Sequence, residues 1–121
     1  MSTENQSMAV ENDAKELVLS FIRALNEEDF EAAGKCLSDD MQFVGVMGTR
    51  DGREAYINDM IKMKLKYNIQ KIFADREDVC LFYDINMGGI TIFSCGWYKI
   101  VDSKIKSFKV IFDPRPLLDK K

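Results

Sequence analysis

The sequence predicts an α+β domain in which helices from the N-terminal half cover one face of a curved, cone-shaped β-sheet, antiparallel or mixed. Apolar residues recur at helical spacing in the first half of the chain, whereas the second half consists of β-rich runs separated by turn signals. At 121 residues the chain has the length of a single domain. The expected order of elements is α-α-β-α-β-β-β-β, with the helices first and a meander of strands after them.

The stretch Ile90–Asp113 predicts a long β-hairpin with a polar turn at Asp102–Lys104. Strand alternation places Ile92, Tyr98 and Ile100 on one face of the first strand, and Phe93, Cys95 and Trp97 on the other. Neither face is polar, so both need a cover. The chain's own helices can cover one face, and we expect a second subunit to cover the other.

Three helices are predicted before the hairpin. An Asp-type capping pattern starts the first, over about 13–26, and Asp29 caps a second that carries Leu37 and ends near residues 38–40. Another capping pattern, Asp51–Glu54, starts the third, which carries Tyr56 and Met60.

Shorter strands are expected between the helices and the hairpin. Apolar runs predict strands at 41–47, 67–74 and 79–87, with a loop at 48–52 and a glycine turn at 88–89. Pro114 and Pro116 end the sheet. We therefore expect a flexible N-terminus (1–10), one domain (11–116) and a C-terminal tail (117–121).

Composition excludes several classes of function. There is no histidine, which removes serine and cysteine catalytic groups built on imidazole and every zinc site that uses it. The net charge of −3 argues against a nucleic-acid partner, and no apolar run is long enough to cross a membrane. Without a signal-peptide pattern or a Cys-x-x-Cys pair, Cys36, Cys80 and Cys95 are expected as free thiols in a reducing cytoplasm. No metal and no cofactor are predicted.

Two carboxylates are candidates for catalysis. Asp84 lies in an otherwise apolar strand, where burial beside Phe82 would raise its pKa and make it a base or acid. The alternative is an ion pair with Lys99, Lys109 or Arg115. Asp113 closes the last strand and, with Arg115, either frames the mouth of a cavity and holds an anionic ligand group, or pins the C-terminus as an ion pair.

Aromatic residues form two groups on the predicted sheet. The first group should point between helices and sheet and bind a ligand or fill the space, together with Tyr56 and Met60 from the third helix and Arg115; its aromatic members are Phe21, Phe43, Phe82, Tyr98, Phe108 and Phe112. The second group should project from the outer face and form a homodimer interface: Phe93, Cys95, Trp97 and Ile111.

Two segments, FIRALNEEDFEAAGKCLSDDMQFVG and MGTRDGREAYINDMI, carry a resemblance to the nuclear-transport-factor-2-like superfamily, which includes ketosteroid isomerase and the SnoaL-like polyketide cyclases. A Trp-Tyr-Lys-Ile strand, a short turn and a final Ile-Phe-Asp strand complete the resemblance, which covers nearly the whole chain. It implies the cone-shaped cystatin-like fold. It does not fix an activity, because the fold hosts isomerases, cyclases, hydrolases, dehydratases, transport adaptors and ligand binders.

The resemblance also locates the isomerase's catalytic positions. A carboxylate base on the first strand corresponds to Gly45 here, a tyrosine donor on the first helix to Phe21, and a protonated aspartate on the penultimate strand to Gly96. All three groups are replaced, so ketosteroid isomerisation is not expected.

Three functions remain open. The leading expectation is a binder of a small, mostly apolar molecule in the cone between helices and sheet. The alternative is an enzyme of isomerase, cyclase or hydrolase type that uses Asp84 or Asp113 as base. The third is a protein-interaction adaptor whose cone is filled.

Overall fold

The computed structural model of the chain describes residues 3–118, so part of the expected tail (119–121) and the first two residues lie outside the described residues. The elements follow in the order α1 (Thr3–Asn26), α2 (Phe30–Lys35), β1 (Leu37–Val44), β2 (Thr49–Asp51), α3 (Arg53–Met63), β3 (Lys66–Asp75), β4 (Asp78–Met87), β5 (Ile90–Val101), β6 (Lys104–Phe112) and α4 (Arg115–Leu118).

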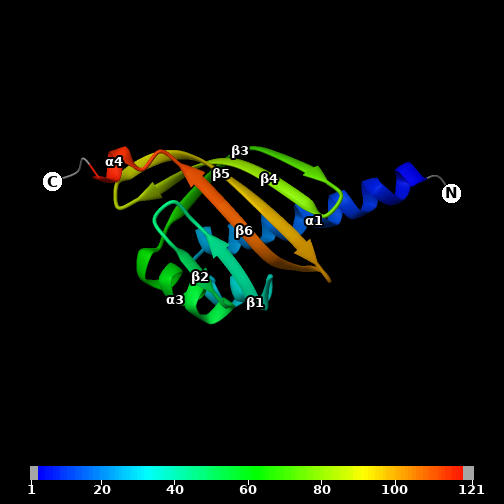
Figure 1. The fold of residues 1–121 in the computed structure, drawn as a ribbon, viewed down its shortest axis with the longest axis horizontal. Helices are drawn as coiled ribbons and strands as arrows, with labels where there is room; N and C mark the ends of the chain where they lie inside the picture. The colour runs from blue at the N-terminus through cyan, green and yellow to red at the C-terminus, as the bar shows by residue number, and fades with distance from the viewer. Residues whose placement is uncertain (1–2, 119–121) are drawn as a thin grey trace.

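The strands form one mixed sheet in the order β2-β1-β6-β5-β4-β3, in which only the β1–β6 pair is parallel within the described chain. The sheet curves, and α1 crosses beneath its long strands while α3 lies with β1 and β2 toward one end (Figure 1). The predicted α+β architecture is therefore confirmed.

The hairpin of β5 and β6 is confirmed, including its turn. Val101 pairs with Lys104, and the two residues between them, Asp102 and Ser103, both have positive φ (51° and 62°). Two consecutive residues of this kind form a hairpin turn whose twist matches that of the strands. Gly88 and Gly89 make the corresponding turn between β4 and β5, with φ of 57° and 91°.

The helix boundaries differ from the prediction in two places. Asp13 does not begin a helix, because α1 already starts at Thr3. Asp29 does cap α2, since its carboxylate accepts from the Ala32 amide at 3.1 Å, but α2 ends at Lys35 and Leu37 is the first residue of β1. Leu37 pairs with Ile105 in the sheet and is fully buried, so strand pairing overrides the helical spacing of its side chain.

Two elements were not predicted. The expected loop at 48–52 contains β2, which pairs with β1 and holds Asp51 opposite Gln42. Asp51 is thus in a strand and does not cap α3, whose N-cap is Gly52 with a φ of 95°. The second new element, α4, follows the predicted end of the sheet at Pro114.

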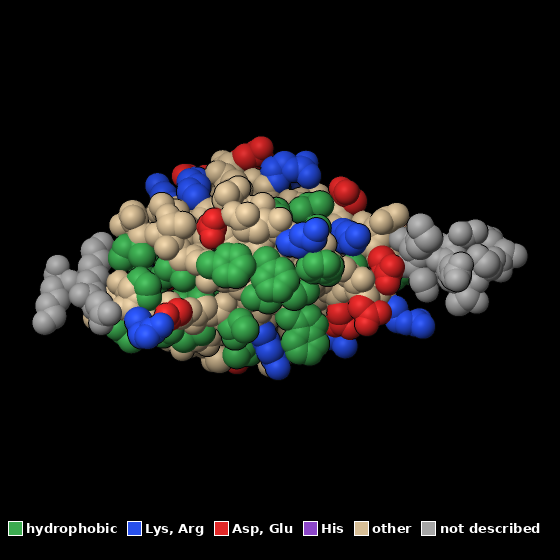
Figure 2. All heavy atoms as spheres, turned by 90° about the horizontal axis from the view of Figure 1, so that it is seen from above, with side chains coloured by type: hydrophobic (Ala, Val, Ile, Leu, Met, Phe, Trp, Pro, Cys, Tyr) green, Lys and Arg blue, Asp and Glu red, His purple; other side chains and the backbone are tan. Residues whose placement is uncertain are grey.

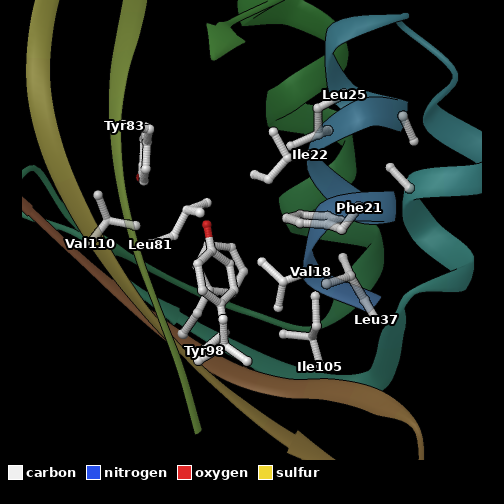
Figure 3. Packing of buried hydrophobic residues seen from close by; sticks show 14 of the residues in the cluster. Val18, Phe21, Ile22, Leu25, Leu37, Leu81, Tyr83, Tyr98, Ile105 and Val110 are labelled. Atoms are coloured by element: carbon white, nitrogen blue, oxygen red, sulfur yellow. The ribbon is translucent and has the colours of Figure 1, made fainter. Parts of the chain in front are cut away.

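The core lies between α1 and the inner face of the sheet. Figure 3 shows Phe21 and Ile22 of α1 facing Leu81, Tyr83 and Tyr98 of the strands. Its centre is aromatic: the ring of Phe21 meets those of Phe108 and Tyr98 edge-on, with centroids 5.8 and 6.4 Å apart. Phe108 and Tyr98 in turn stack on each other at 4.8 Å.

One side chain joins the end of α1 to the edge of the sheet. The Asn26 amide oxygen accepts from the Tyr67 backbone N–H at 2.7 Å, and its nitrogen donates to the Tyr67 carbonyl at 2.9 Å. Because β3 is an edge strand, these two backbone groups have no strand partner on that side. The Asn26 side chain therefore takes the place of another strand.

We expect Asn26→Ala to lower the free energy of unfolding by about 1–3 kcal/mol, because two backbone groups of Tyr67 lose their partner. Urea denaturation followed by circular dichroism measures the change. The control is Glu27→Ala, an exposed neighbour whose side chain makes no hydrogen bond to any residue between 3 and 118. Equal unfolding midpoints for the two variants would contradict this account of the junction.

Candidate functional site

A cavity of about 380 Å³ lies between α3 and the inner face of the sheet. Its walls come from the loop between β1 and β2, from one face of α3, and from the inward side chains of β3, β4, β5 and β6, with Leu117 of α4 at the rim. Two further hollows of similar volume are open surface grooves with charged side chains, one between α2 and α3 and one beside the first half of α1. Of these three hollows, only the cavity between α3 and the sheet combines apolar walls with a position between the layers, so we take it as the candidate site.

The wall nearest α1 is a continuous aromatic surface. Phe43 of β1 packs against Phe108 of β6 at a centroid distance of 5.0 Å, and Tyr56 of α3 packs against both at 5.3 and 5.2 Å. Tyr98 extends this surface through its stack on Phe108. The strand alternation that turns these rings inward also turns Val110 into the cavity. The wall is therefore built mostly of aromatic rings packed on one another.

All four tyrosines of the chain line this cavity, and each comes from a different element: Tyr56 from α3, Tyr67 from β3, Tyr83 from β4 and Tyr98 from β5. Tyr67 and Tyr83 were not predicted at the site. Burial raises the pKa of Tyr56, Tyr83 and Tyr98 far above the usual value, and it raises the pKa of Tyr67 as well. The four phenols are therefore neutral hydrogen-bond donors at physiological pH.

The charged groups on the cavity lining, Arg50 and Asp59, pair with each other. Arg50 of β2 donates from Nε to Oδ2 of Asp59 on α3 at 2.5 Å. The carboxylate raises the pKa of the Arg50 guanidinium. The pair lies where half of the arginine side chain remains exposed, so it marks the mouth of the cavity and leaves the interior uncharged.

The three positions that correspond to isomerase catalytic groups lie close to the aromatic wall. Gly45 lines the cavity, and a Cβ at this position would lie 2.8 Å from the Phe43 ring. A Cβ at Gly96 would lie 2.9 Å from the Tyr98 ring. Phe21 is fully buried behind the wall. A carboxylate at either glycine would have to displace an aromatic ring that now forms the wall.

Asp84 lies outside the cavity, on the outer face of the sheet. Its neighbours in β4, Tyr83 and Ile85, are the residues that turn inward. Asp84 accepts a hydrogen bond from Gln70 at 2.8 Å, and the register of β3 and β4 shifts between Ile69 and Lys71, leaving Gln70 as an extra residue. Neither of the two alternatives considered from the sequence, a buried base or an ion pair with a basic residue, describes this arrangement.

Asp113 and Arg115 pair with each other near the C-terminal end of the described chain. Arg115 donates from Nε to both carboxylate oxygens at 2.9 Å and from a terminal nitrogen at 2.6 Å. The guanidinium holds the pKa of Asp113 below its usual range. Both side chains are largely exposed, and neither contributes to the cavity lining. The ion-pair alternative describes their arrangement.

Phe82, expected inside, lies on the outer face and corrects the prediction for β4. It stacks on Phe93 at 6.1 Å and meets Phe73 edge-on at 6.2 Å. The residues expected on the outer face are found there: Phe93, Trp97 and Ile111 are 60%, 50% and 66% exposed, and Cys95 is half-buried. Figure 2 shows a hydrophobic patch in the middle of one side of the molecule, ringed by charged side chains.

The remaining predicted ligand contacts are divided between the cavity and the core. Six of them line the cavity: Phe43, Tyr56, Met60, Tyr98, Phe108 and Phe112.

No cluster of three or more possible metal-ligating side chains occurs within residues 3–118, and none of the helices described there is long and apolar enough to span a membrane.

The comparisons with known proteins agree with this fold. The family model for the SnoaL-like domain matches residues 18–108, and the chain therefore belongs to the SnoaL-like family within the NTF2-like superfamily. No curated protein matches the sequence. A solved NTF2-like protein of unknown function from Cytophaga hutchinsonii is 52% identical, with a TM-score of 0.86 over 87% of this chain and 94% of that one.

Two enzymes share the fold at lower identity. An LEH-like epoxide hydrolase of M. tuberculosis is 22% identical, with a TM-score of 0.79 over 90% of this chain and 89% of that one. The epoxide hydrolase/cyclase-like enzyme SalBIII, which acts in pyran ring formation in the polyether salinomycin, is 19% identical, with a TM-score of 0.76 over 85% and 92% of the two chains. At these identities the likeness extends to the fold alone.

Proposed function

We propose that this chain binds a small, mostly apolar molecule in the cavity between α3 and the sheet. The observation that carries the proposal is a hollow of about 380 Å³ with aromatic and aliphatic walls inside the layered fold. Protein interiors otherwise pack to the density of organic crystals. A space of this size and apolar lining is typical of a binding site for a compact organic ligand.

The alternatives receive less support. Carboxylate catalysis is not favoured, since Asp84 and Asp113 lie outside the lining and Asp59 is paired with Arg50. An adaptor with a filled cone is disfavoured by the cavity volume itself. The two enzymes of similar fold are too distant in sequence to lend this chain their reactions.

The test is a thermal-shift screen of wild type and Val110→Phe against small apolar and amphipathic compounds. A ligand at about 100 times its Kd adds ~2.7 kcal/mol of stability, which raises the Tm of a domain this size by several degrees. Val110 lines the cavity, so the larger phenylalanine should occupy ligand space and abolish the shifts. The control, Ile111→Phe, changes the next residue, which points outward, and should keep them.

Two results would contradict the proposal. If no compound raises the Tm of the wild type, the cavity does not bind ligands of this class. If the same compounds shift Val110→Phe as much as the wild type, they bind elsewhere. A circular dichroism spectrum of Val110→Phe like that of the wild type shows that the variant is folded.

The outer face of the sheet supports a second proposal, a homodimer that buries this face. Phe93, Trp97 and Ile111 are each at least half exposed and adjoin the half-buried Cys95 and the stacked Phe82. A contiguous aromatic surface of this kind is typical of a protein interface. The occupant we propose is the same face of a second copy, because a two-fold dimer covers both faces at once.

We expect sedimentation analysis at micromolar concentration to give twice the mass of one chain for the wild type and a single-chain mass for Ile111→Asp. A carboxylate at this exposed position would have to be desolvated in the dimer without a partner. Ile61→Asp, an equivalent change at an exposed residue of α3, should remain dimeric. A monomeric wild type, or a dimeric Ile111→Asp, would show that the outer face has another role.

We also propose that the protein is cytoplasmic. The thiols of Cys80 and Cys95 lie 3.5 Å apart on the outer face and are not bonded, and Cys36 is also free. Unbonded thiols so close together fit a reducing compartment.

A further inference from the structure

The thiols of Cys80 and Cys95 meet on the outer face of the sheet, where β4 pairs with β5. Their sulfur atoms lie 3.5 Å apart, and one thiol donates a weak hydrogen bond to the other. Cys80 lies opposite Trp97 in the strand register. Cys95 lies opposite Phe82, two residues further along β4, so the cysteines are diagonal neighbours. Both side chains are free and partly exposed, and two sulfur groups are therefore within reach of each other and of solvent.

The third cysteine of the chain has a different environment. Cys36 is the C-cap residue of α2, and its thiol donates to the carbonyl oxygen of Ala32 at 3.6 Å. Burial raises the pKa of the Cys36 thiol, which keeps it protonated and unreactive at physiological pH. Cys36 is thus an internal reference for the reactivity of the other two cysteines.

The two thiols of the pair are not equivalent. Burial raises the pKa of Cys95 to about 11, and the neighbouring Cys80 adds to the effect. Cys95 therefore stays a protonated thiol at physiological pH, whereas the thiolate is the form that attacks an oxidant. When Cys80 ionises, the S–H group of Cys95 can donate to its sulfur. Cys80 is thus the sulfur that attacks first, and Cys95 is the sulfur that follows.

A disulfide between these two cysteines would be easy to reduce. The backbones of diagonal cross-strand neighbours are farther apart than those of directly opposite residues. A bond between diagonal neighbours therefore requires a movement of the strands and stores strain. Strained or exposed disulfides are reduced more readily than structural ones. The dithiol is accordingly the resting state in a reducing compartment, and the disulfide is a transient state.

We propose that Cys80 and Cys95 form a modification site on the outer face, at which a hydroperoxide oxidises the two thiols to a reversible disulfide between β4 and β5. The Cys80 thiolate attacks the terminal peroxide oxygen, the O–O bond breaks, and the other oxygen leaves as hydroxide or alkoxide, so Cys80 becomes a sulfenic acid. The Cys95 sulfur then attacks the Cys80 sulfur. The S–O bond breaks, and the hydroxyl group leaves as water with the proton of Cys95. The two sulfurs give two electrons to the peroxide, and two molecules of a small thiol return them by reducing the disulfide.

The pair also lies inside the surface that we propose as the dimer interface. Cys95 lies opposite Phe82 on one side and Ile111 on the other, and both belong to that surface. A dimer would cover the thiols, so a hydroperoxide would reach them only in dissociated chains. This step rests on the proposed dimer, whereas the disulfide itself does not. Oxidation of the pair would then mark chains that have lost their partner.

Oxidation of the dilute, folded wild type by hydrogen peroxide tests the inference. After the reaction, alkylation in urea should label one thiol per chain, whereas the untreated chain has three cysteines to label. Peptide mapping should find Cys80 linked to Cys95 and the label on Cys36. Reduced glutathione should restore all three thiols. The control variant, Cys36→Ser, should form the same disulfide.

Two further variants identify the role of each sulfur. In Cys95→Ser the second thiol is missing, so Cys80 should stop at the sulfenic acid, which dimedone traps. In Cys80→Ser the dimedone labelling of Cys95 should be several-fold slower, because burial leaves little of this thiol ionised. Equal labelling rates in the two variants would contradict the assignment of Cys80 as the attacking sulfur.

Three results on the wild type would overturn the inference, and none of them depends on the folding of a variant. They are a disulfide that includes Cys36, further oxidation of Cys80 without a disulfide, and a disulfide that reduced glutathione does not open. Repeating the reaction at rising protein concentration tests the effect of the dimer. Slower oxidation per chain where sedimentation shows a dimer supports shielding, and an unchanged rate contradicts it. A wild type that stays monomeric contradicts the dimer alone, since the mapping still decides the disulfide.

Discussion

The rest of the structure depends on the edge-on contact of Phe21 with Phe108 and Tyr98, which fixes α1 to the inner face of the sheet. The stack of Tyr98 on Phe108 requires the absence of a side chain at Gly96, because a Cβ there would meet the Tyr98 ring. With α1 held at this point, one end of the cone is filled by core residues. The other end, between α3 and the strands, contains the cavity, and the rings of its wall pack against each other.

Much of the fold could be predicted because local signals agreed with the final structure. The hairpin of β5 and β6 follows from β-rich runs around a polar turn, and both of its faces proved to be as apolar as the sequence indicates. Leu37 was misplaced because its helical spacing is a local feature, whereas its pairing with Ile105 joins residues far apart in the chain. Phe82 was misplaced because alternation separates the two faces of β4 but does not say which is inner when both carry aromatic rings.

The sequence predicted the candidate site less completely than it predicted the fold. Six of the predicted contacts line the cavity, since α3 and the strands present them at regular spacing. Tyr83 was not predicted at the site because Asp84 was expected to face inward, and adjacent residues of a strand face opposite ways. In the structure Asp84 faces outward and Tyr83 faces the cavity. Arg50 and Asp59 carry no signal at all, since they meet only when β2 pairs with β1 and brings the arginine beside α3. The tyrosine hydroxyls of the cavity come from positions other than Phe21, Gly45 and Gly96, which correspond to the isomerase catalytic groups. Comparison of the sequence with the isomerase therefore does not point to these tyrosines.

The most direct test of the account is a spectrophotometric titration of the four tyrosines, which reports whether their phenols are buried together. All four should stay neutral in the folded protein as the pH rises through about 10, the usual pKa of tyrosine, whereas all four should ionise near that pH in urea. Burial raises the pKa of the tyrosines in the folded protein, so the folded state favours their neutral form. The stability that comes from these neutral phenols is complete below the tyrosine pKa of the unfolded chain, and it is lost as the pH rises from there toward the tyrosine pKa of the folded protein. The fold should therefore weaken above about pH 10, with tyrosinate absorbance and loss of circular dichroism rising together. Ionisation of one or more tyrosines near pH 10 with the fold intact would contradict the account.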